Sequence, residues 1–140
     1  MRWIAVGDGS GMVGIGVGKS KESADIAAVQ GYIKDVKNLQ FIPRYENRTI
    51  SNEINAKKGA CHLNLFPASP GSGIKASGVT YKLCTLIGIK DITSKNFRGR
   101  NDYNTATLLI EALKTRQRPL EELSMIRGRE IVDVKKAYFQ

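Results

Sequence analysis

The sequence predicts an α+β fold in which strands and helices alternate along the chain. Large and small residues alternate over residues 12–18, and apolar and polar residues alternate over residues 60–66, which is the pattern of strands. Apolar residues recur at helical spacing over residues 20–39 and 103–115. With 140 residues, 41% of them hydrophobic, the chain can form one domain or two small ones around a modest core.

The first part, residues 1–44, is predicted to be a hairpin covered by one helix. Residues 2–7 and 12–18 flank an Asp-Gly turn, which is a strong hairpin signal. The glycines of the second strand share one face, which lets either a packed helix or a nucleic-acid backbone come close. We expect Ser20, or alternatively Ser23, to cap the helix that follows. The apolar stripe expected to cover the hairpin comprises Ile26, Val29, Ile33 and Val36.

A second part, residues 45–123, is predicted to follow a boundary at residues 41–43, and residues 124–140 to form a basic tail. In chain order we expect a strand (46–54), a basic turn (55–59), a strand (60–66), a helix (79–87), a short strand (92–95), a loop (96–102), a helix (103–115), a helix opened by Pro119 and a tail (131–139) that can be helical. The buried positions expected in the last two helices are Ala106, Leu109, Ile110, Leu113, Leu120, Leu123 and Ile126.

A glycine-rich loop leads from the strand of residues 60–66 to a helix that Gly88 ends in a left-handed cap. Pro67 and Pro70 stop the strand, and Gly71 and Gly73 allow backbone angles that other residues resist. The free amides of a helix start favour a phosphate, whereas serines there can also simply cap the helix. The serines expected near the first helical turn are Ser69, Ser72 and Ser77.

Positive charge is the strongest compositional signal. Lys and Arg number 22 against 13 Asp and Glu, which gives a net charge of +9. The basic residues occur in several groups along the chain, and this distribution indicates a surface that meets polyphosphate on several sides. No apolar run approaches the ~20 residues of a membrane span, and no secretory signal is evident. Membrane association is therefore not expected.

The sequence contains neither a zinc-ligand set nor a complete nucleotide-binding motif. Cys61 and Cys84 indicate buried, reduced thiols in a reducing compartment, and with the single His62 they cannot supply a zinc set of the usual spacing. Residues 9–14 fit the dinucleotide pattern GxGxxG, but a strand follows where a helix is required. Residues 18–20 resemble the end of a phosphate loop without its first glycine. We expect no catalytic residue, no metal and no cofactor.

Taken together, the motifs resemble the fifth family of small-subunit ribosomal proteins, from about Val6 to Arg129. Residues 41–50 are similar to its mitochondrial branch in particular, whereas the glycine loop is closer to the bacterial form. The motifs that carry the resemblance are Gly7-Asp8-Gly9-x-Gly11-x-Val13-Gly14, Gly18-Lys19, Pro67-Ala68-Ser69-Pro70-Gly71-Ser72-Gly73-Ile74, Gly88-Ile89-Lys90-Asp91 and Asn101-x-x-Asn104.

The resemblance implies a truncated β-β-α unit like a double-stranded RNA-binding domain, then a β-β-α-β-α domain and a helical C-terminal tail. It implies a structural constituent of the small ribosomal subunit that binds ribosomal RNA near the messenger entry side and supports translation accuracy. The implied protein partners are the fourth and eighth small-subunit families, with messenger RNA a further candidate. The implied location is the mitochondrial ribosome in the matrix, with a plastid or the bacterial cytoplasm as alternatives.

The residues expected to contact RNA combine the basic groups with the polar residues of the loops. They are Lys19, Lys21, Lys57, Lys58, Ser69, Ser72, Lys75, Lys95, Arg98, Arg100, Asn101, Arg127 and Arg129. Gly73, Tyr81 and Lys82 are expected at a protein interface, with Tyr81 at the position of a family arginine. A family strand that would precede residue 1 is missing, so we expect another segment, polypeptide or RNA strand to cover the edge of residues 3–6.

Two alternatives remain open at this point. The same folds would serve a free-standing RNA-binding module or an RNA-dependent regulator, which co-sedimentation with small subunits distinguishes from a ribosomal component. A phosphotransfer enzyme with the second fold lacks an acidic metal ligand near the glycine loop.

Overall fold

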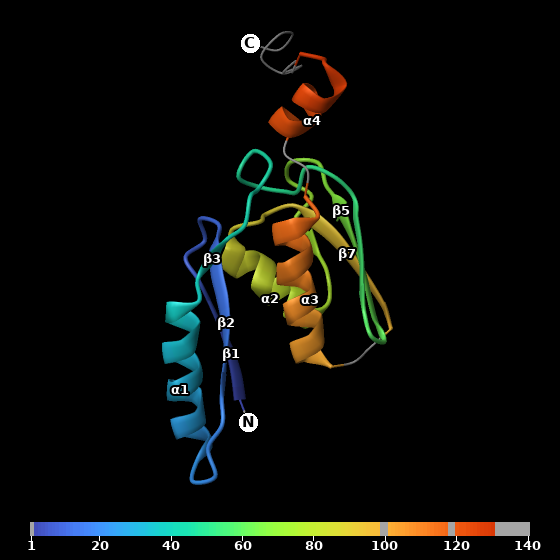
Figure 1. Cartoon of the computed structure of the whole chain (residues 1–140). Helices are drawn as coiled ribbons and strands as arrows, with labels where there is room; N and C mark the ends of the chain where they lie inside the picture. The colour runs from blue at the N-terminus through green and yellow to red at the C-terminus, as the bar shows by residue number, and fades with distance from the viewer. Residues whose placement is uncertain (1, 99–100, 118–119, 131–140) are drawn as a thin grey trace.

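The computed structural model describes residues 2–98, 101–117 and 120–130, and it confirms the α+β class with two sheets (Figure 1). The N-terminal part consists of β1 (Arg2–Gly7), β2 (Met12–Gly18), α1 (Ala24–Lys37) and the two-residue β3 (Gln40–Phe41). Its sheet has the order β1-β2-β3, and β3 pairs only with Met12 and Val13 of β2.

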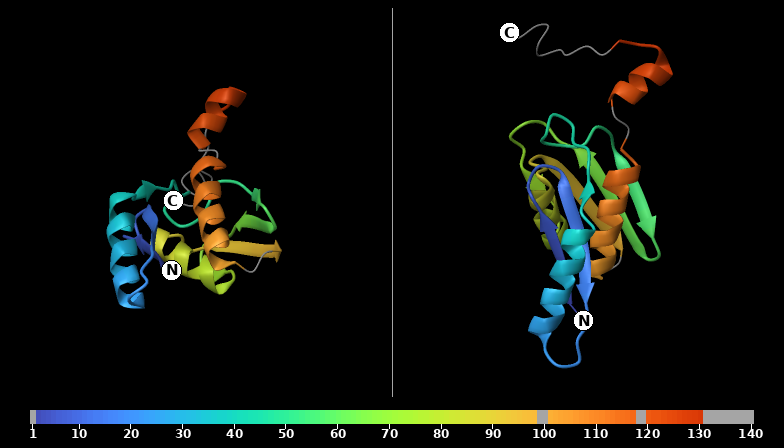
Figure 2. Two further views of the ribbon diagram at one scale, coloured as in Figure 1. Left: turned by 60° about the horizontal axis from the view of Figure 1, so that its bottom comes forward. Right: turned by 60° about the vertical axis from the view of Figure 1, so that its left-hand side comes forward.

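The second sheet has the order β4-β5-β7-β6, and only β6 and β7 run parallel. Its strands are β4 (Ile54–Lys58), β5 (Cys61–Pro67), β6 (Ile74–Lys75) and β7 (Ile92–Arg98). The helices are α2 (Gly78–Ile87), α3 (Asp102–Thr115) and α4 (Leu120–Arg127). Figures 1 and 2 show that α2 and α3 lie between the second sheet and the hairpin of β1 and β2, whereas α4 lies beyond them.

The core lies where α2 and α3 pack on the second sheet. Alternation along β5 directs Cys61, Leu63 and Leu65 inward, because successive side chains of a strand point to opposite faces. Gly88, with φ 97°, ends α2 in the predicted left-handed cap. The side chains buried against one another include Ile54, Leu63, Leu65, Leu83, Ile87, Ile92, Leu109 and Leu113.

The hairpin turn is anchored to the end of α2 by backbone hydrogen bonds. The Gly9 N–H donates to the Leu86 carbonyl oxygen and the Gly11 N–H donates to the Ile87 carbonyl oxygen, each at 2.8 Å. Arg44 adds a side-chain bond from Nη1 to the Gly88 oxygen at 3.1 Å. These contacts fix the N-terminal sheet against the second part of the chain.

The prediction that Ile26, Val29, Ile33 and Val36 cover the hairpin is wrong. The side of α1 that meets the sheet consists of Ala27, Gly31 and Asp35, and it faces Gly14, Gly16 and Gly18 of β2. A Cβ atom added to any of these three glycines would collide with Asp35 or with the α1 backbone. The sheet therefore accepts only the small side of the helix, and the large apolar side chains point outward. Ser23, the alternative of the two predicted caps, accepts the Ile26 N–H at 3.2 Å, so α1 begins at Ala24.

Residues 46–54 do not form the predicted strand. Glu46 and Asn47 have φ angles of 53° and 57°, and a tight turn brings Tyr45 and Thr49 together. The strand instead begins at Ile54, so the basic residues expected in a turn belong to β4. The strand after Gly88 is longer than predicted, since β7 continues to Arg98.

The α4 helix starts close to its predicted position, but Ile126 is 70% exposed rather than buried. Pro119 and the predicted tail of residues 131–139 lie outside the described residues.

Candidate nucleic-acid interface

One face of the second sheet is open among the described residues, because α2 and α3 both pack on the other face (Figures 1 and 2). The register pairs Lys57 with His62 across β4 and β5, and Asn64 with Lys95 across β5 and β7. Since residues of β5 alternate, these side chains share the face opposite the core. We call Lys57, His62, Asn64, Phe66 and Lys95 the open sheet face.

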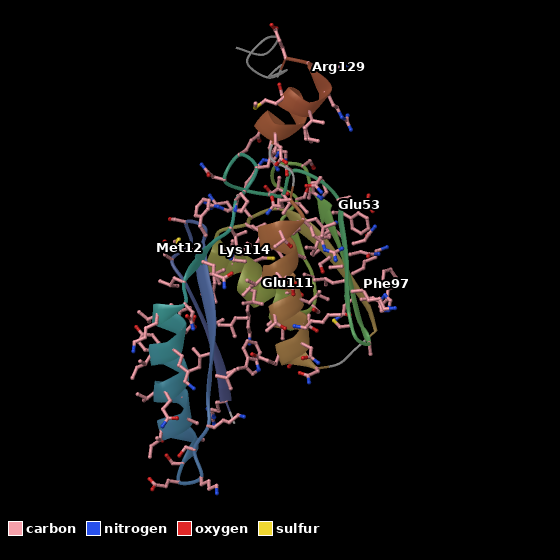
Figure 3. The ribbon with its side chains drawn as sticks, viewed as in Figure 1. Met12, Glu53, Phe97, Glu111, Lys114 and Arg129 are labelled. Atoms are coloured by element: carbon pink, nitrogen blue, oxygen red, sulfur yellow. The ribbon has the colours of Figure 1, made fainter. Side chains whose placement is uncertain are left out.

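Two of the predicted RNA-binding residues thus lie on one surface, while the others lie elsewhere. Lys19 and Lys21 lie between β2 and α1, Lys58 ends β4, and Lys75 lies on the edge strand β6. Arg127 and Arg129 are exposed at the end of α4 and beyond it, and Figure 3 shows Arg129 far from Phe97. The side chains of Arg98 and Arg100 lie outside the described residues, and Asn101 caps α3 through bonds from the Tyr103 and Asn104 N–H groups.

Ser69 and Ser72 do not lie at a helix start, because β6 separates the glycine loop from α2. Their hydroxyl groups form a hydrogen bond with each other, with 2.7 Å between the two oxygens, and neither serine caps α2. Ser77 is the residue before α2, but its hydroxyl donates to Thr80 Oγ1 at 3.3 Å rather than capping the backbone. The predicted phosphate site at this helix start is therefore not assembled from Ser69 and Ser72.

The glycine loop is instead held by an ion pair that the sequence did not single out. Arg48 Nη1 lies 3.6 Å from Asp91 Oδ2 and donates to the Ala68 carbonyl oxygen at 2.7 Å. Asp91 Oδ1 accepts the Gly73 N–H at 3.0 Å. Gly71 and Gly73 have φ angles of 84° and 76°, as their predicted freedom requires. The sequence held a signal for this pair, since Asp91 lies in a motif that carries the family resemblance and Arg48 lies in the segment 41–50 that is similar to the mitochondrial branch.

The predicted protein-interface residues lie on two neighbouring segments of the chain, the glycine loop and α2. Tyr81 and Lys82 are exposed on α2, and Gly73 is half-buried in the loop before β6. A Cβ atom on Gly73 would meet nothing within 4 Å.

A basic groove of about 660 Å³ lies between α3 and the end of α1. Its lining includes the backbone of Gly14 with Lys37, Tyr103, Glu111 and Lys114, and Figure 3 labels the last two on α3. A neighbouring hollow of about 450 Å³ adds Lys19 and Lys34 and shares Tyr103. Of these lysines only Lys19 was predicted as a site residue, because the approach of α1 to α3 leaves no mark in the local sequence.

Asp35 is a buried carboxylate beneath the glycines of β2. It is 0% exposed, and neither oxygen has a hydrogen-bond partner of normal geometry among the described residues. Burial raises its pKa to about 6, and the nearby Val6 backbone N–H lowers it by less. The neutral acid is therefore favoured in the folded protein below this pH.

The two thiols are buried and unpaired, as predicted. Burial raises the pKa of Cys84 to about 12, which keeps this thiol protonated and unreactive. The described residues place no three His, Cys, Asp or Glu side chains together in a way that could hold a metal ion. None of the described helices combines the length and apolar character needed to cross a membrane.

Comparison with known proteins identifies the family. Residues 2–43 match the model of ribosomal protein S5, N-terminal domain, and residues 56–127 match that of ribosomal protein S5, C-terminal domain. Small ribosomal subunit protein uS5m of Neurospora crassa is 38% identical over 136 residues, and that of Schizosaccharomyces pombe is 36% identical over 135. Small ribosomal subunit protein uS5 of the bacterium Fusobacterium nucleatum is 36% identical over 130 residues.

The matched region makes up different shares of these relatives. It covers 97%, 96% and 93% of this chain, but 28% and 34% of the two fungal proteins and 77% of the bacterial one. Both domain models match in chain order, and the bacterial relative is aligned over most of its own length. The chain therefore belongs to the ribosomal protein S5 family.

Proposed function

We propose that the chain is a structural, non-enzymatic component of a small ribosomal subunit. The observation that carries this proposal is the match of both S5 domain models, in order, over residues 2–43 and 56–127. The names of its fungal relatives, small ribosomal subunit protein uS5m, support the ribosome of mitochondria as its location. Ribosomal proteins of this kind act by binding and holding RNA, so the net charge of +9 supports the same role.

The ligand proposed for the basic surfaces is ribosomal RNA, recognised through its phosphates. Lys57 and Lys95 on the open sheet face, Lys19 and Lys21 before α1, and the basic groove beside α3 present cations on several sides. Duplex RNA is recognised chiefly by shape and by backbone contacts, which matches a surface rich in lysine. The remaining predicted RNA contacts belong to the same proposal.

The finer assignments rest on the family resemblance. The N-terminal β-β-α unit would act like a truncated double-stranded RNA-binding domain within residues 1–44, followed by a domain of residues 45–123 and a basic tail. The fourth and eighth small-subunit proteins would be its neighbours near the messenger entry side, with Gly73, Tyr81 and Lys82 at the protein contact. Support for translation accuracy would follow from that position.

Sedimentation of the chain with ribosomal particles tests the proposal. The chain is expressed with an epitope tag in fungal mitochondria, and extracts are resolved on sucrose gradients at high magnesium concentration. We expect it to migrate with the small subunit at about one copy per particle and to remain there after a salt wash. A free-standing RNA-binding module would stay at the top of the gradient or leave the particle in the wash, and either result contradicts the proposal.

A further inference from the structure

The outer side of α1 carries an uncovered apolar surface. Twelve large hydrophobic side chains are exposed among the described residues, and seven of them lie within residues 26–41. Five of the seven lie on α1 itself and are between 42% and 59% exposed, namely Ile26, Val29, Tyr32, Ile33 and Val36. We call these five residues the α1 stripe.

The stripe cannot be buried by turning α1 on its sheet. Ala27 and Gly31 contact the backbone of Gly16 and Gly18 directly, and no larger side chain fits between the helix and these glycines. At 3.6 residues per turn the stripe lies on the side of the helix opposite Ala27 and Gly31. Its exposure is therefore a consequence of the glycine contact rather than of an alternative packing of the same helix.

The spacing of the stripe is that of a helix-packing seam. Ile26, Val29, Ile33 and Val36 follow at intervals of three, four and three residues, which are the a and d positions of two heptads. An a/d seam receives the side chains of a second helix as knobs in holes. We propose that the α1 stripe is the docking surface for an amphipathic helix of a second, different protein.

Charges beside the seam define the chemistry of that helix. The positions that flank the a and d residues include Asp25 at one end and Lys37 at the other, and both are exposed. A complementary helix has a basic residue facing Asp25 and an acidic residue facing Lys37.

A second copy of this chain does not meet that requirement. In parallel self-pairing Asp25 would face Gln30, and Lys37 would face Tyr32, so neither charge would find its opposite. Two molecules that each carry a net charge of +9 also repel one another. RNA is disfavoured because the centre of the seam is aliphatic and offers phosphate no cation.

A designed peptide tests the seam on the isolated chain. The probe is a 21-residue helix with leucine at a and d, glutamate facing Lys37 and lysine facing Asp25, and binding is followed by fluorescence anisotropy. We expect saturable binding in the micromolar range and at least a tenfold loss in the double variant Val29→Lys/Ile33→Lys. The control Met125→Lys/Ile126→Lys changes two residues of α4 that are still more exposed, at 85% and 70% against 59% and 50% for Val29 and Ile33, and should bind as the unaltered chain does.

A second test reverses the flanking charges, and it remains decisive even if the variant Val29→Lys/Ile33→Lys does not fold. A peptide with the two flanking charges exchanged should bind about fivefold more weakly, and Lys37→Glu should bring the two peptides closer together or reverse their order. Absence of binding, equal binding of both peptides, or a dimer that Val29→Lys/Ile33→Lys dissociates would each overturn the proposal.

Thiol labelling tests whether the seam is covered in the particle. Both native cysteines are buried, so in a Val29→Cys variant maleimide reports on residue 29 alone. In particles that contain the variant we expect labelling at least tenfold slower than in the free chain, and the protection should survive ribonuclease. Rapid labelling in the particle, or labelling that ribonuclease restores, would contradict a protein partner. Loss of co-sedimentation would contradict the proposed ribosomal role instead, and the peptide titration alone would then decide whether the seam binds a helix.

Discussion

Single small residues determine how the N-terminal part packs. Gly16 and Gly18 of β2 have no side chain toward α1, and Gly31 of α1 has none toward β2. The backbones of the two elements are therefore in direct contact. The price is a buried carboxylate, because Asp35 shares that side of the helix and has no hydrogen-bond partner of normal geometry in the described part of the chain. Stability in this region therefore depends on side-chain size and on the protonation of one acid.

A methyl group on Gly16 should disrupt this packing. The added Cβ would collide with the Gly31 carbonyl oxygen and the Asp35 backbone, and we expect Gly16→Ala to destabilise the fold by about 2–4 kcal/mol in urea unfolding. Gly78→Ala is the matched control, since nothing lies within 4 Å of its added Cβ. A change below about 1 kcal/mol in Gly16→Ala would show that α1 does not pack as described.

Asp35 should make stability depend on pH. Its pKa rises from 3.8 in the unfolded chain to about 6 in the fold, so the folded state binds the proton more tightly. The stability difference between Asp35→Asn and the unaltered chain should be small below pH 4, grow between pH 4 and 6, and reach about 3 kcal/mol in favour of the variant above pH 6. Urea unfolding of both proteins from pH 3.5 to 8 measures this, and a difference independent of pH would contradict it.

Gly73→Asp should impair assembly more than folding. The left-handed φ of 76° costs a non-glycine residue about 1–2 kcal/mol, but the added side chain meets nothing within 4 Å. The new carboxylate would repel phosphate at the proposed RNA and protein contact. Gly73→Asn carries the same backbone cost without the charge, so it should co-sediment better. If Gly73→Asp loses several kcal/mol of stability in isolation, the loop has a structural role and the proposed contact is wrong.

At the scale of elements, the sequence predicted what depends on local pattern. Alternation predicted β2 and the Asp-Gly turn predicted β1, both at their observed bounds, and helical spacing with Gly88 predicted α2 and its end. Local pattern does not predict elements that depend on tertiary contacts. The strands β3 and β6 are only two residues long, which is too short for a pattern to show. The start of β4 at Ile54 is determined by its pairing with β5. The wrong face of α1 has the same cause, because the glycines that select it lie on another element.

The outer edge of β1 should be covered in the assembled ribosomal particle. The described residues place β2 on one side of β1 and no strand on the other, and an open edge readily pairs with another chain. Of the amides of residues 2–6, we expect those that point away from β2 to exchange hydrogen rapidly in the isolated chain and slowly in small-subunit particles. A structure of the particle in which this edge faces solvent, with no partner within hydrogen-bond reach, would contradict the expectation.

At the scale of the whole molecule, the sequence predicted the positive charge but not its arrangement. Lys57 and Lys95 lie on one sheet face because of the register of β4, β5 and β7. Lys37 and Lys114 line one groove because α1 and α3 lie close together. The resulting cations point in several directions instead of forming one cleft. Such a surface suits a protein embedded among RNA segments and is poorly suited to reading one base sequence.

The salt dependence of RNA binding tests this role most directly. Affinity for a small-subunit ribosomal RNA fragment is measured by filter binding between about 50 and 300 mM KCl, with an unrelated duplex of equal length as control. If about six phosphates are neutralised, the log–log slope should be near −5, and the unrelated duplex should bind with a similar slope. A slope shallower than about −2, or strong discrimination between unrelated duplexes, would contradict binding through dispersed phosphate contacts.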